Sequence, residues 1–362
     1  MSMTIWLRAE LKENEYRSPL TPNDAAVLLS DGYRVVVERS NQRIFQDKEY
    51  SDVGCMLANQ NSWHSANKDT VILGIKELPD DTRPLKHQHI YFGHAYKQQA
   101  GWEHIIGRFK RHGGTLLDLE YLTNENGRRL AAFGYWAGYA GTAIALKIWL
   151  GRQIEGQKFI LQPQTPYSSK EHLIDELTSG FKKLEASNAP KTIVIGALGR
   201  CGQGASVLLE EFDIPVVKWD IAETQQGAPF KQLLNFDILI NTVLLGSPIP
   251  PFLTRELIKS KTRTLSVISD ISCDPDSSGN PLPIYNQATT FTEPTIRLVE
   301  NGNPLDITAI DHLPSLLPRE SSTEFSNQLL PALQRINKWS GEWQRCAKAY
   351  DTHSEKININ QV

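Results

Sequence analysis

The residues best suited to hold a cofactor lie in a glycine-rich turn after the β-branched run Thr-Ile-Val-Ile at residues 192–195. Gly196 permits a tight bend, Gly199 lets the backbone approach a pyrophosphate, and Gly202 lets the next helix pack closely on the strand. Asp220 follows about one strand–helix–strand unit later, where a carboxylate binds a ribose 2′-hydroxyl and repels a 2′-phosphate. The pattern predicts an NAD site; the alternative is a glycine-rich α/β turn that binds nothing.

Two side chains at predicted strand ends could transfer protons. Lys76 ends the strand expected over 70–75, and partial burial would lower its pKa unless Glu77 opposed the shift. His94 ends the strand expected over 89–94, and histidine titrates near neutral pH. The alternatives are a solvated loop lysine and a core or helix-capping histidine.

Three arginines could anchor a substrate with more than one carboxylate, because guanidinium groups bind carboxylates in a bidentate manner. Arg17 precedes the first predicted helix, and Arg128 and Arg129 are adjacent in Asn-Gly-Arg-Arg-Leu. Each could instead be an ordinary surface arginine. Asp118 and Glu120, near a strand end, could tune neighbouring pKa values or be exposed carboxylates.

Composition excludes several classes of function. The 362 residues suggest two domains, and a net charge of −3 argues against nucleic-acid and membrane partners. Four widely spaced cysteines fit the reducing cytoplasm, and we expect no secretion signal. The apolar stretch 133–150 contains glycines and a lysine, which indicates a buried helix rather than a membrane span. His87, His89 and His94 suggest zinc, but no cysteine or carboxylate cluster completes a site, so we expect no metal.

Alternating helix and strand signals predict open parallel sheets whose strand ends carry these residues. We expect further strands over 4–8, 33–38, 116–121, 192–197, 216–220, 238–242 and 264–270. A helix should follow the cap at Thr21, and a last helix should span 326–349, with Pro331 bending it or delaying its start. We expect loops over 151–172 and 297–305.

Several short segments, taken in order along the sequence, resemble those of the NAD-dependent, lysine-forming saccharopine dehydrogenases. The resemblance extends over nearly the whole chain. The segments include Leu-Arg-Ala-Glu, Arg-Ser-Pro-Leu-Thr-Pro, Gly-Ile-Lys-Glu-Leu-Pro, Phe-Gly-His-Ala-Tyr-Lys, Ile-Gly-Ala-Leu-Gly-Arg-Cys-Gly, Lys-Trp-Asp-Ile and Ile-Asp-His-Leu-Pro-Ser-Leu-Leu-Pro-Arg-Glu. The resemblance implies an α/β, alanine-dehydrogenase-like fold of two Rossmann-like domains with a cleft between them. The NAD domain, 134–319, would be inserted in the substrate domain, 1–133, which 320–362 completes.

The resemblance also implies residue roles. Lys76 and His94 would form the proton-transfer pair, with Glu77 and Glu120 tuning their pKa values. The substrate would contact Arg17, Lys97, Gln99, Arg129, Phe133, Ser272, Cys273 and Asp274. NAD would contact Arg128, Gly196, Gly199, Arg200, Gly202, Asp220, Thr224, Leu244, Ile271, Ile310, Asp311, His312 and Leu313. Leu244 replaces an aromatic residue of the family, and Thr242 replaces a cysteine, which leaves Cys201 without a disulfide mate.

The implied reaction is reversible NAD-dependent oxidative deamination of saccharopine to lysine and 2-oxoglutarate, in lysine metabolism, by a cytoplasmic monomer. Lys76 would deprotonate the secondary amine, and His94 would serve the imine steps. Three alternatives stay open: another opine or amino-acid dehydrogenase of this fold, a non-catalytic NAD-binding sensor, and an NADP-linked saccharopine reductase, against which Asp220 weighs.

Overall fold

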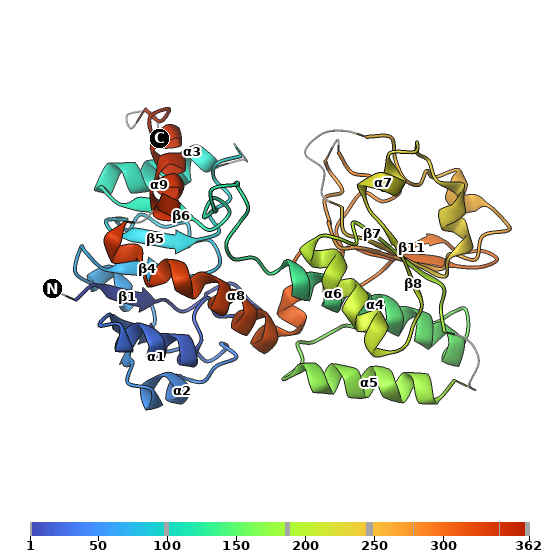
Figure 1. Cartoon of the computed structure of the whole chain (residues 1–362), viewed down its shortest axis with the longest axis horizontal. Coiled ribbons are helices and arrows are strands. Elements are labelled where there is room, and N and C mark those ends of the chain that lie inside the picture. Colours follow the sequence, from blue (N-terminus) through green and yellow to red (C-terminus); the bar gives the residue numbers. More distant parts are fainter. Residues whose placement is uncertain are drawn as a thin grey trace. The chain divides into compact units, whose positions relative to one another are not determined.

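The computed structural model divides the chain into two units, Met1–Ala132 with Pro318–Val362 and Phe133–Leu317. The residues described are 2–97, 101–184, 189–243, 249–277, 279–339 and 341–358. The chain begins in the first unit, builds the second and returns, so the blue and red ends of the colour scale share one unit (Figure 1). This confirms the predicted α/β class and the insertion of one Rossmann-like domain in the other. The cleft between the domains stays a prediction.

Among the described residues, a six-stranded sheet forms the centre of the first unit, in the order β3-β2-β1-β4-β5-β6. Its strands are β1 (Thr4–Leu7), β2 (Arg34–Glu38), β3 (Met56–Ala58), β4 (Val71–Leu73), β5 (Gln88–Tyr91) and β6 (Thr115–Asp118). Each neighbouring pair is parallel, so the carboxyl ends of the strands meet at one edge. The helices of this unit are α1 (Pro22–Ser30), α2 (Asp47–Asp52), α3 (Trp102–His112), α8 (Pro318–Leu333) and α9 (Gly341–Ser354).

In the described part of the second unit, the sheet again has six strands, in the order β11-β12-β10-β9-β7-β8. They are β7 (Thr192–Ile195), β8 (Val216–Trp219), β9 (Ile238–Asn241), β10 (Val267–Asp270), β11 (Ile296–Val299) and β12 (Leu305–Thr308). The edge strand β11 runs antiparallel to β12, and the other pairs are parallel. Every residue of β7, β9, β10 and β12 is buried, as expected for parallel strands covered on both faces.

The helices of the second unit are α4 (Gly134–Glu155), α5 (Lys170–Lys182), α6 (Arg200–Glu211) and α7 (Ile221–Thr224). The long helix α4 packs against both α6 and α5 (Figure 1). Glycines let α4 and α6 approach closely: a Cβ at Gly138 would lie 1.8 Å from the Cys201 carbonyl oxygen. A Cβ at Gly204 would lie 1.9 Å from that of Tyr135. This contact anchors the helix that follows the glycine-rich turn.

The predicted helix over 326–349 is wrong in its bounds. The structure has two helices there, α8 and α9, and Trp339 between them adopts a left-handed backbone with φ +49°. Pro331 lies in the last turn of α8 rather than at its start. Because proline has no N–H and its ring crowds the carbonyl of the preceding turn, a helix ends readily near it.

The predicted loops over 151–172 and 297–305 are also partly wrong. Helix α4 continues to Glu155, α5 begins at Lys170, and the second stretch contains most of β11 and the first residue of β12. Sequence reasoning also misses the short strands β3 and β12. Strands of three or four residues are too short to show a clear alternation of polar and apolar side chains.

Candidate active site

The predicted proton-transfer residues follow neighbouring strands of the first unit. Lys76 comes shortly after β4, His94 after β5 and Glu120 after β6. Because these strands are adjacent and parallel, the three turns leave the sheet at one edge. His94 Nε2 lies 3.8 Å from Glu77 Oε1, and His94 Nδ1 lies 4.0 Å from Glu120 Oε2. The structure therefore brings His94, Glu77 and Glu120 together beside the Lys76 turn.

His94 adopts an uncommon backbone conformation for a non-glycine residue, with φ +50°. Its half-exposed ring stacks on Phe92, with the ring centroids 6.3 Å apart. Its distances to Glu77 and Glu120 are longer than a hydrogen bond. Neither carboxylate therefore holds a ring nitrogen tightly, which suits a group that must exchange protons with a substrate.

Lys76 lies in an environment that disfavours its charged form. Burial is the main cause that lowers the pKa of the Lys76 ammonium below its ordinary value, and the nearby Arg17 guanidinium adds to the effect. Glu15 and, more weakly, Glu77 raise the pKa and so oppose this shift. A lysine with a lowered pKa gives up its proton more readily than an ordinary lysine and is better suited to act as a general base.

Arg17 and Glu15 form a buried bidentate ion pair. Arg17 Nε donates to Glu15 Oε1 at 2.7 Å and an Arg17 terminal nitrogen donates to Oε2 at 2.6 Å. Burial alone would raise the pKa of Glu15, but Arg17 and Lys76 lower it below its ordinary value. Arg17 thus acts on Lys76 through charge, and its predicted contact with a substrate carboxylate stays a prediction.

Glu120 gathers two cations at the same edge. Arg129 lies 3.1 Å from Glu120 Oε1, and Lys97 Nζ lies 3.2 Å from Oε2. The Glu120 side chain is 10% exposed, whereas those of Lys97 and Arg129 are 53% and 39% exposed. A buried carboxylate therefore holds two half-exposed cations where an anionic substrate could meet them.

Asp118, the last residue of β6, is fully buried, which excludes the expectation that it is an exposed carboxylate. Its Oδ1 accepts a hydrogen bond from the Glu120 N–H at 2.9 Å, and its Oδ2 accepts one from the Gly93 N–H at 3.2 Å. Burial raises the pKa of the Asp118 carboxyl to about 7, although these backbone donors act in the opposite direction.

Arg8 and Glu10, which follow β1, are site residues that sequence reasoning missed. Glu10 Oε1 accepts from the Ile75 N–H at 2.7 Å, and Oε2 accepts from the Lys76 N–H at 3.0 Å. Arg8 lies 3.3 Å from Glu10 and donates to the Lys76 carbonyl oxygen. The sequence feature that would have identified them is a pair of oppositely charged residues at the end of a predicted strand. Such residues lie at the same edge of the sheet as the turns that carry Lys76 and His94.

In the second unit, the glycine-rich turn has the shape predicted for a phosphate cradle. Gly196 has φ +83°, and a Cβ there would lie 2.6 Å from Thr242 Oγ1. A Cβ at Gly202 would lie 2.2 Å from the Gly196 carbonyl oxygen, so side chains are excluded at both positions. Gly199 directly precedes α6, and a Cβ there would meet only the Gly196 oxygen, at 3.4 Å. The turn therefore leaves room at the N-terminus of α6 for a pyrophosphate.

Asp220 follows β8 and supports this turn. Its Oδ2 accepts a hydrogen bond from the Leu198 N–H at 3.0 Å, and its Oδ1 accepts one from the Ile221 N–H at 2.9 Å. An ionised carboxylate has about four acceptor positions. The side chain also accepts from the Glu223 N–H in a capping box, so about one acceptor position is left for a ribose hydroxyl. Thr224 Oγ1 donates to the Asp220 carbonyl oxygen at 2.9 Å, and Arg200 is the first residue of α6.

The remaining predicted residues of this unit follow β10 and β12. Ser272 Oγ donates to the Val243 carbonyl oxygen at 2.7 Å, and the Cys273 thiol donates to that of Ala309 at 2.9 Å. Those with exposed or partly exposed side chains are Ile271, Ser272, Cys273, Asp274, Asp311 and His312. Ile310 and Leu313 have side chains buried in the core. At these positions only main-chain atoms would be able to contact a cofactor.

Four predicted contacts are assigned to neither cluster. Gln99 and Leu244 lie outside the described residues. Arg128 is exposed in a turn where its N–H donates to Asn124 Oδ1 at 2.9 Å. Phe133 directly precedes α4. Their predicted roles stay predictions.

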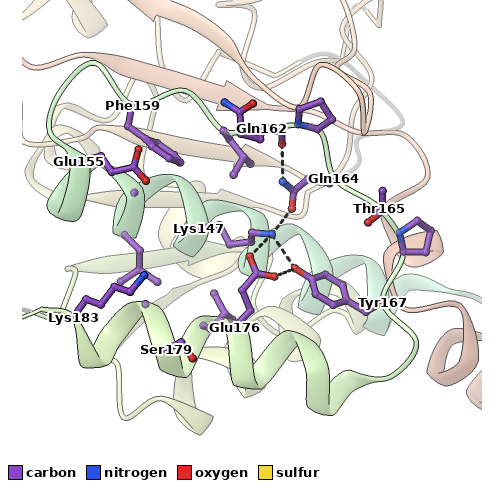
Figure 2. Close-up of a pocket in the computed structure, with 17 residues that line it drawn as sticks. Lys147, Glu155, Phe159, Gln162, Gln164, Thr165, Tyr167, Glu176, Ser179 and Lys183 are labelled. Carbon is purple, nitrogen blue, oxygen red and sulfur yellow. Dashed lines mark hydrogen bonds and ion pairs between the residues drawn. The ribbon is translucent and has the colours of Figure 1, made fainter.

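A cavity of about 550 Å³ lies elsewhere in the second unit, between α4, α5 and the segment that joins them (Figure 2). Lys147 occupies its centre, with Tyr167 Oη and Glu176 Oε1 each 2.8 Å from the Lys147 nitrogen. Lys147 also donates to Gln164, and Tyr167 donates to Glu176. The polar groups at the centre thus satisfy one another, and of the described residues that line the cavity none is a predicted site residue.

The histidines considered for zinc have structural surroundings. The His89 ring is fully buried against Trp63 and Phe109, at 4.8 and 5.3 Å between centroids, and burial lowers its pKa well below the ordinary value. Over the described ranges, no group of three His, Cys, Asp or Glu side chains has a metal-binding arrangement. No helix in the described part of the chain is long and apolar enough to cross a membrane.

Comparisons with known proteins agree with this architecture. Residues 6–140 match the family model for the N-terminal domain of alanine dehydrogenase/PNT, and residues 137–361 match that for the C-terminal domain. A solved L-alanine dehydrogenase has a similar fold, with a TM-score of 0.68 at 18% identity over 96% of this chain and 94% of that one.

Two curated fungal proteins are similar along nearly their whole length. Saccharopine dehydrogenase (NAD(+), L-lysine-forming) of Emericella nidulans is 47% identical, over 92% of this chain and 92% of the relative. The protein of the same name in Yarrowia lipolytica is 44% identical, over 98% of both chains.

Proposed function

This chain belongs to the family of NAD(+)-dependent, L-lysine-forming saccharopine dehydrogenases, and we propose that it catalyses the reaction for which the family is named. Saccharopine, water and NAD⁺ are converted reversibly to lysine, 2-oxoglutarate, NADH and a proton. The proposal rests on the arrangement at the edge of the first sheet. Lys76, whose pKa is lowered, follows β4, and His94 follows the neighbouring strand β5.

Lys76 is the proposed base for the first step. Its unprotonated amine takes the proton from the secondary amine of saccharopine, which raises the electron density on that nitrogen. A bound NAD would supply the hydride acceptor for the adjacent glutarate carbon, and loss of that hydride would leave a carbon–nitrogen double bond.

His94 is the proposed acid–base group for the hydrolysis that follows. A water adds to the carbon of the double bond and loses a proton to the imidazole, which then protonates the lysine nitrogen. The carbon–nitrogen bond breaks as the new hydroxyl group gives its proton to the imidazole, which leaves lysine and 2-oxoglutarate. The lack of a tight hydrogen bond from Glu77 or Glu120 leaves the ring able to serve both roles.

Saccharopine carries three carboxylates, and the cations at the sheet edge are proposed to bind them. Lys97 and Arg129 are half-exposed and therefore able to reach a ligand while Glu120 holds their position. The other proposed substrate contacts are Arg17, Gln99, Phe133, Ser272, Cys273 and Asp274.

NAD is proposed to lie along the glycine-rich turn of the second unit, with its pyrophosphate near Gly199 and its adenosine ribose near Asp220. A 2′-phosphate beside Asp220 would meet a like charge, so the structure favours NAD over NADP. The remaining proposed contacts are Arg128, Gly196, Arg200, Gly202, Thr224, Leu244, Ile271, Ile310, Asp311, His312 and Leu313.

We place the reaction in the cytoplasm and propose that the enzyme acts as a monomer. All four cysteines, which lie within the described residues, are free thiols, as suits a reducing compartment. Size-exclusion chromatography with light scattering would test the monomer.

The test of the function is NADH absorbance with purified protein, lysine and 2-oxoglutarate. We expect NADH to be oxidised, with a fall in its absorbance, only when both lysine and 2-oxoglutarate are present. Loss only when ornithine replaces lysine, or pyruvate replaces 2-oxoglutarate, would instead identify another dehydrogenase of this fold. NADH binding without loss would leave a non-catalytic protein.

A further inference from the structure

Two buried carboxyl groups hold the turns that carry the proton-transfer pair, and we propose that Glu10 and Asp118 are positioning residues for Lys76 and His94. The inference rests on the proposed function, since it assigns Lys76 and His94 to proton transfer. Neither Glu10 nor Asp118 has a role in the predicted set of substrate and cofactor contacts.

Asp118 joins two turns of the edge. One carboxylate oxygen accepts from the N–H of Gly93, directly before His94, and the other accepts from the N–H of Glu120. The His94 N–H is a further donor to this carboxylate. The acid–base residue and the carboxylate 4.0 Å from its ring are therefore fixed by the same buried group.

The His94 turn depends on this support. A left-handed backbone at a residue other than glycine is strained and persists only where its surroundings enforce it. Gly93 lies so close to β6 that a Cβ there would be 2.6 Å from Leu116 Cδ2 and 3.3 Å from Asp118 Oδ2. The turn thus rests directly on the Asp118 carboxylate, and its strained backbone is held by the N–H groups that this carboxylate binds.

Glu10 has the equivalent place under the Lys76 turn. Its two oxygens accept from the consecutive N–H groups of Ile75 and Lys76, at 2.7 and 3.0 Å. Arg8 completes the arrangement, since it pairs with Glu10 and donates to the Lys76 carbonyl oxygen. Both main-chain polar groups of Lys76 are therefore held by side chains from the segment after β1.

An amide cannot replace either group when the group is ionised, which for Asp118 requires a pH above about 7. A carboxylate offers acceptors on both oxygens, whereas asparagine or glutamine must turn an NH₂ group toward one of the N–H donors. Such a substitution keeps the side-chain volume but sets donor against donor in a buried place. The turn is then expected to move, and a displacement near 1 Å can slow catalysis by about 10²-fold.

Other titratable groups lie around the Asp118 carboxyl. Each of them must be considered when a change in the pH profile of kcat is attributed to Asp118. They come from the elements packed around it and are Tyr91, Tyr96, Tyr121, Glu120 and Cys346. The tyrosines and Cys346 all have pKa values raised by burial and are uncharged near neutral pH.

The test compares Asp118→Asn and Glu10→Gln with Asp24→Asn. Asp24 is a buried carboxyl of the same unit that accepts a hydrogen bond from Ser326, away from the Lys76 and His94 turns. For each variant we would measure kcat and its pH profile, the Kd for NADH, the melting temperature, and hydrogen exchange of peptides spanning 74–77 and 92–95.

We expect kcat to fall at least about tenfold in Asp118→Asn and Glu10→Gln, with an unchanged Kd for NADH and a cooperative melting transition. The acid limb of the kcat profile should change in Asp118→Asn, with faster exchange confined to 92–95; Glu10→Gln should speed exchange at 74–77. Asp24→Asn should change only the melting temperature.

Folded variants with wild-type kcat would overturn the inference, as would faster exchange spread over the whole unit instead of confined to 74–77 or 92–95. If one variant does not fold, the other decides by the same criteria. An inactive wild-type enzyme would instead refute the proposed function, while the exchange measurements would still test whether the two carboxylates hold their turns.

Discussion

Gly202→Ala should destabilise the second unit, because the glycine-rich turn leaves no room for its side chain. The new Cβ would lie 2.2 Å from the Gly196 carbonyl oxygen and 2.5 Å from the Ala197 Cα, both backbone atoms. Ordinary contacts begin near 3.4 Å, so α6 or the turn must move by about 1 Å. Overpacking of this kind costs about 1–3 kcal/mol, which corresponds to a melting temperature lower by roughly 2–12 °C.

Gly199→Ala is the matched control in the same turn. Gly199 has φ −73°, which suits alanine, and its Cβ would be 3.4 Å from the nearest atom, so the fold should be unaffected. If a pyrophosphate approaches the backbone there, the Cβ should weaken NADH binding by about tenfold, or 1.4 kcal/mol. Thermal melts and fluorescence titration with NADH measure both effects.

Either variant can refute the reasoning. A Gly202→Ala protein with wild-type melting temperature and NADH affinity would show that α6 does not need to pack so closely. A Gly199→Ala protein with wild-type affinity would place the pyrophosphate elsewhere.

Three further predictions concern single charged groups. Lys76→Met and His94→Gln should each slow turnover by about 10²- to 10⁴-fold with an unchanged melting temperature; turnover near that of the wild type would remove that residue from the mechanism. Asp220→Ala should narrow the preference for NAD over NADP in kcat/KM, and an unchanged ratio would mean that another group binds the ribose. Because the pKa of Asp118 rises from 3.8 to about 7 on folding, its charge is costly above about pH 7 and absent below about pH 4. The melting temperature of Asp118→Asn relative to wild type should therefore increase between pH 4 and pH 7, and a constant difference would contradict the shift.

The residues that could be predicted from sequence are those whose place follows from parallel-sheet geometry. Lys76, His94 and Asp220 each stand at or directly after the end of a predicted strand, and within each sheet parallel strands bring such positions to one edge. Glu10 and Asp118 occupy equivalent positions, yet their burial depends on the strands and turns that cover them. A buried carboxylate that binds a turn and an exposed carboxylate have the same sequence pattern. The positioning role proposed for Glu10 and Asp118 is therefore inferred only from the N–H groups that they bind in the structure.

The final helices illustrate a second limit. Apolar residues recur at helical spacing across the break, because Ile336 and Trp343 are both buried although a turn separates them. Periodicity reports which side chains face the core, and it does not register a single residue such as Trp339 that reverses the backbone.

The charged side chains at the edge of the first sheet fall into a buried group and a half-exposed group. We expect the half-exposed group to bind substrate and the buried group to shift the pKa of Lys76. The Arg17–Glu15 pair is buried, with side chains 5% and 2% exposed, and it lies close enough to Lys76 to influence its pKa. Lys97 and Arg129 are half-exposed on the buried Glu120 and can turn toward a ligand at little desolvation cost. A buried cation already bonded to its carboxylate gains less from a second anion than an exposed one does. We therefore expect the edge around Glu120 to bind substrate carboxylates more readily than Arg17 does, while Arg17 adds to the lowering of the Lys76 pKa.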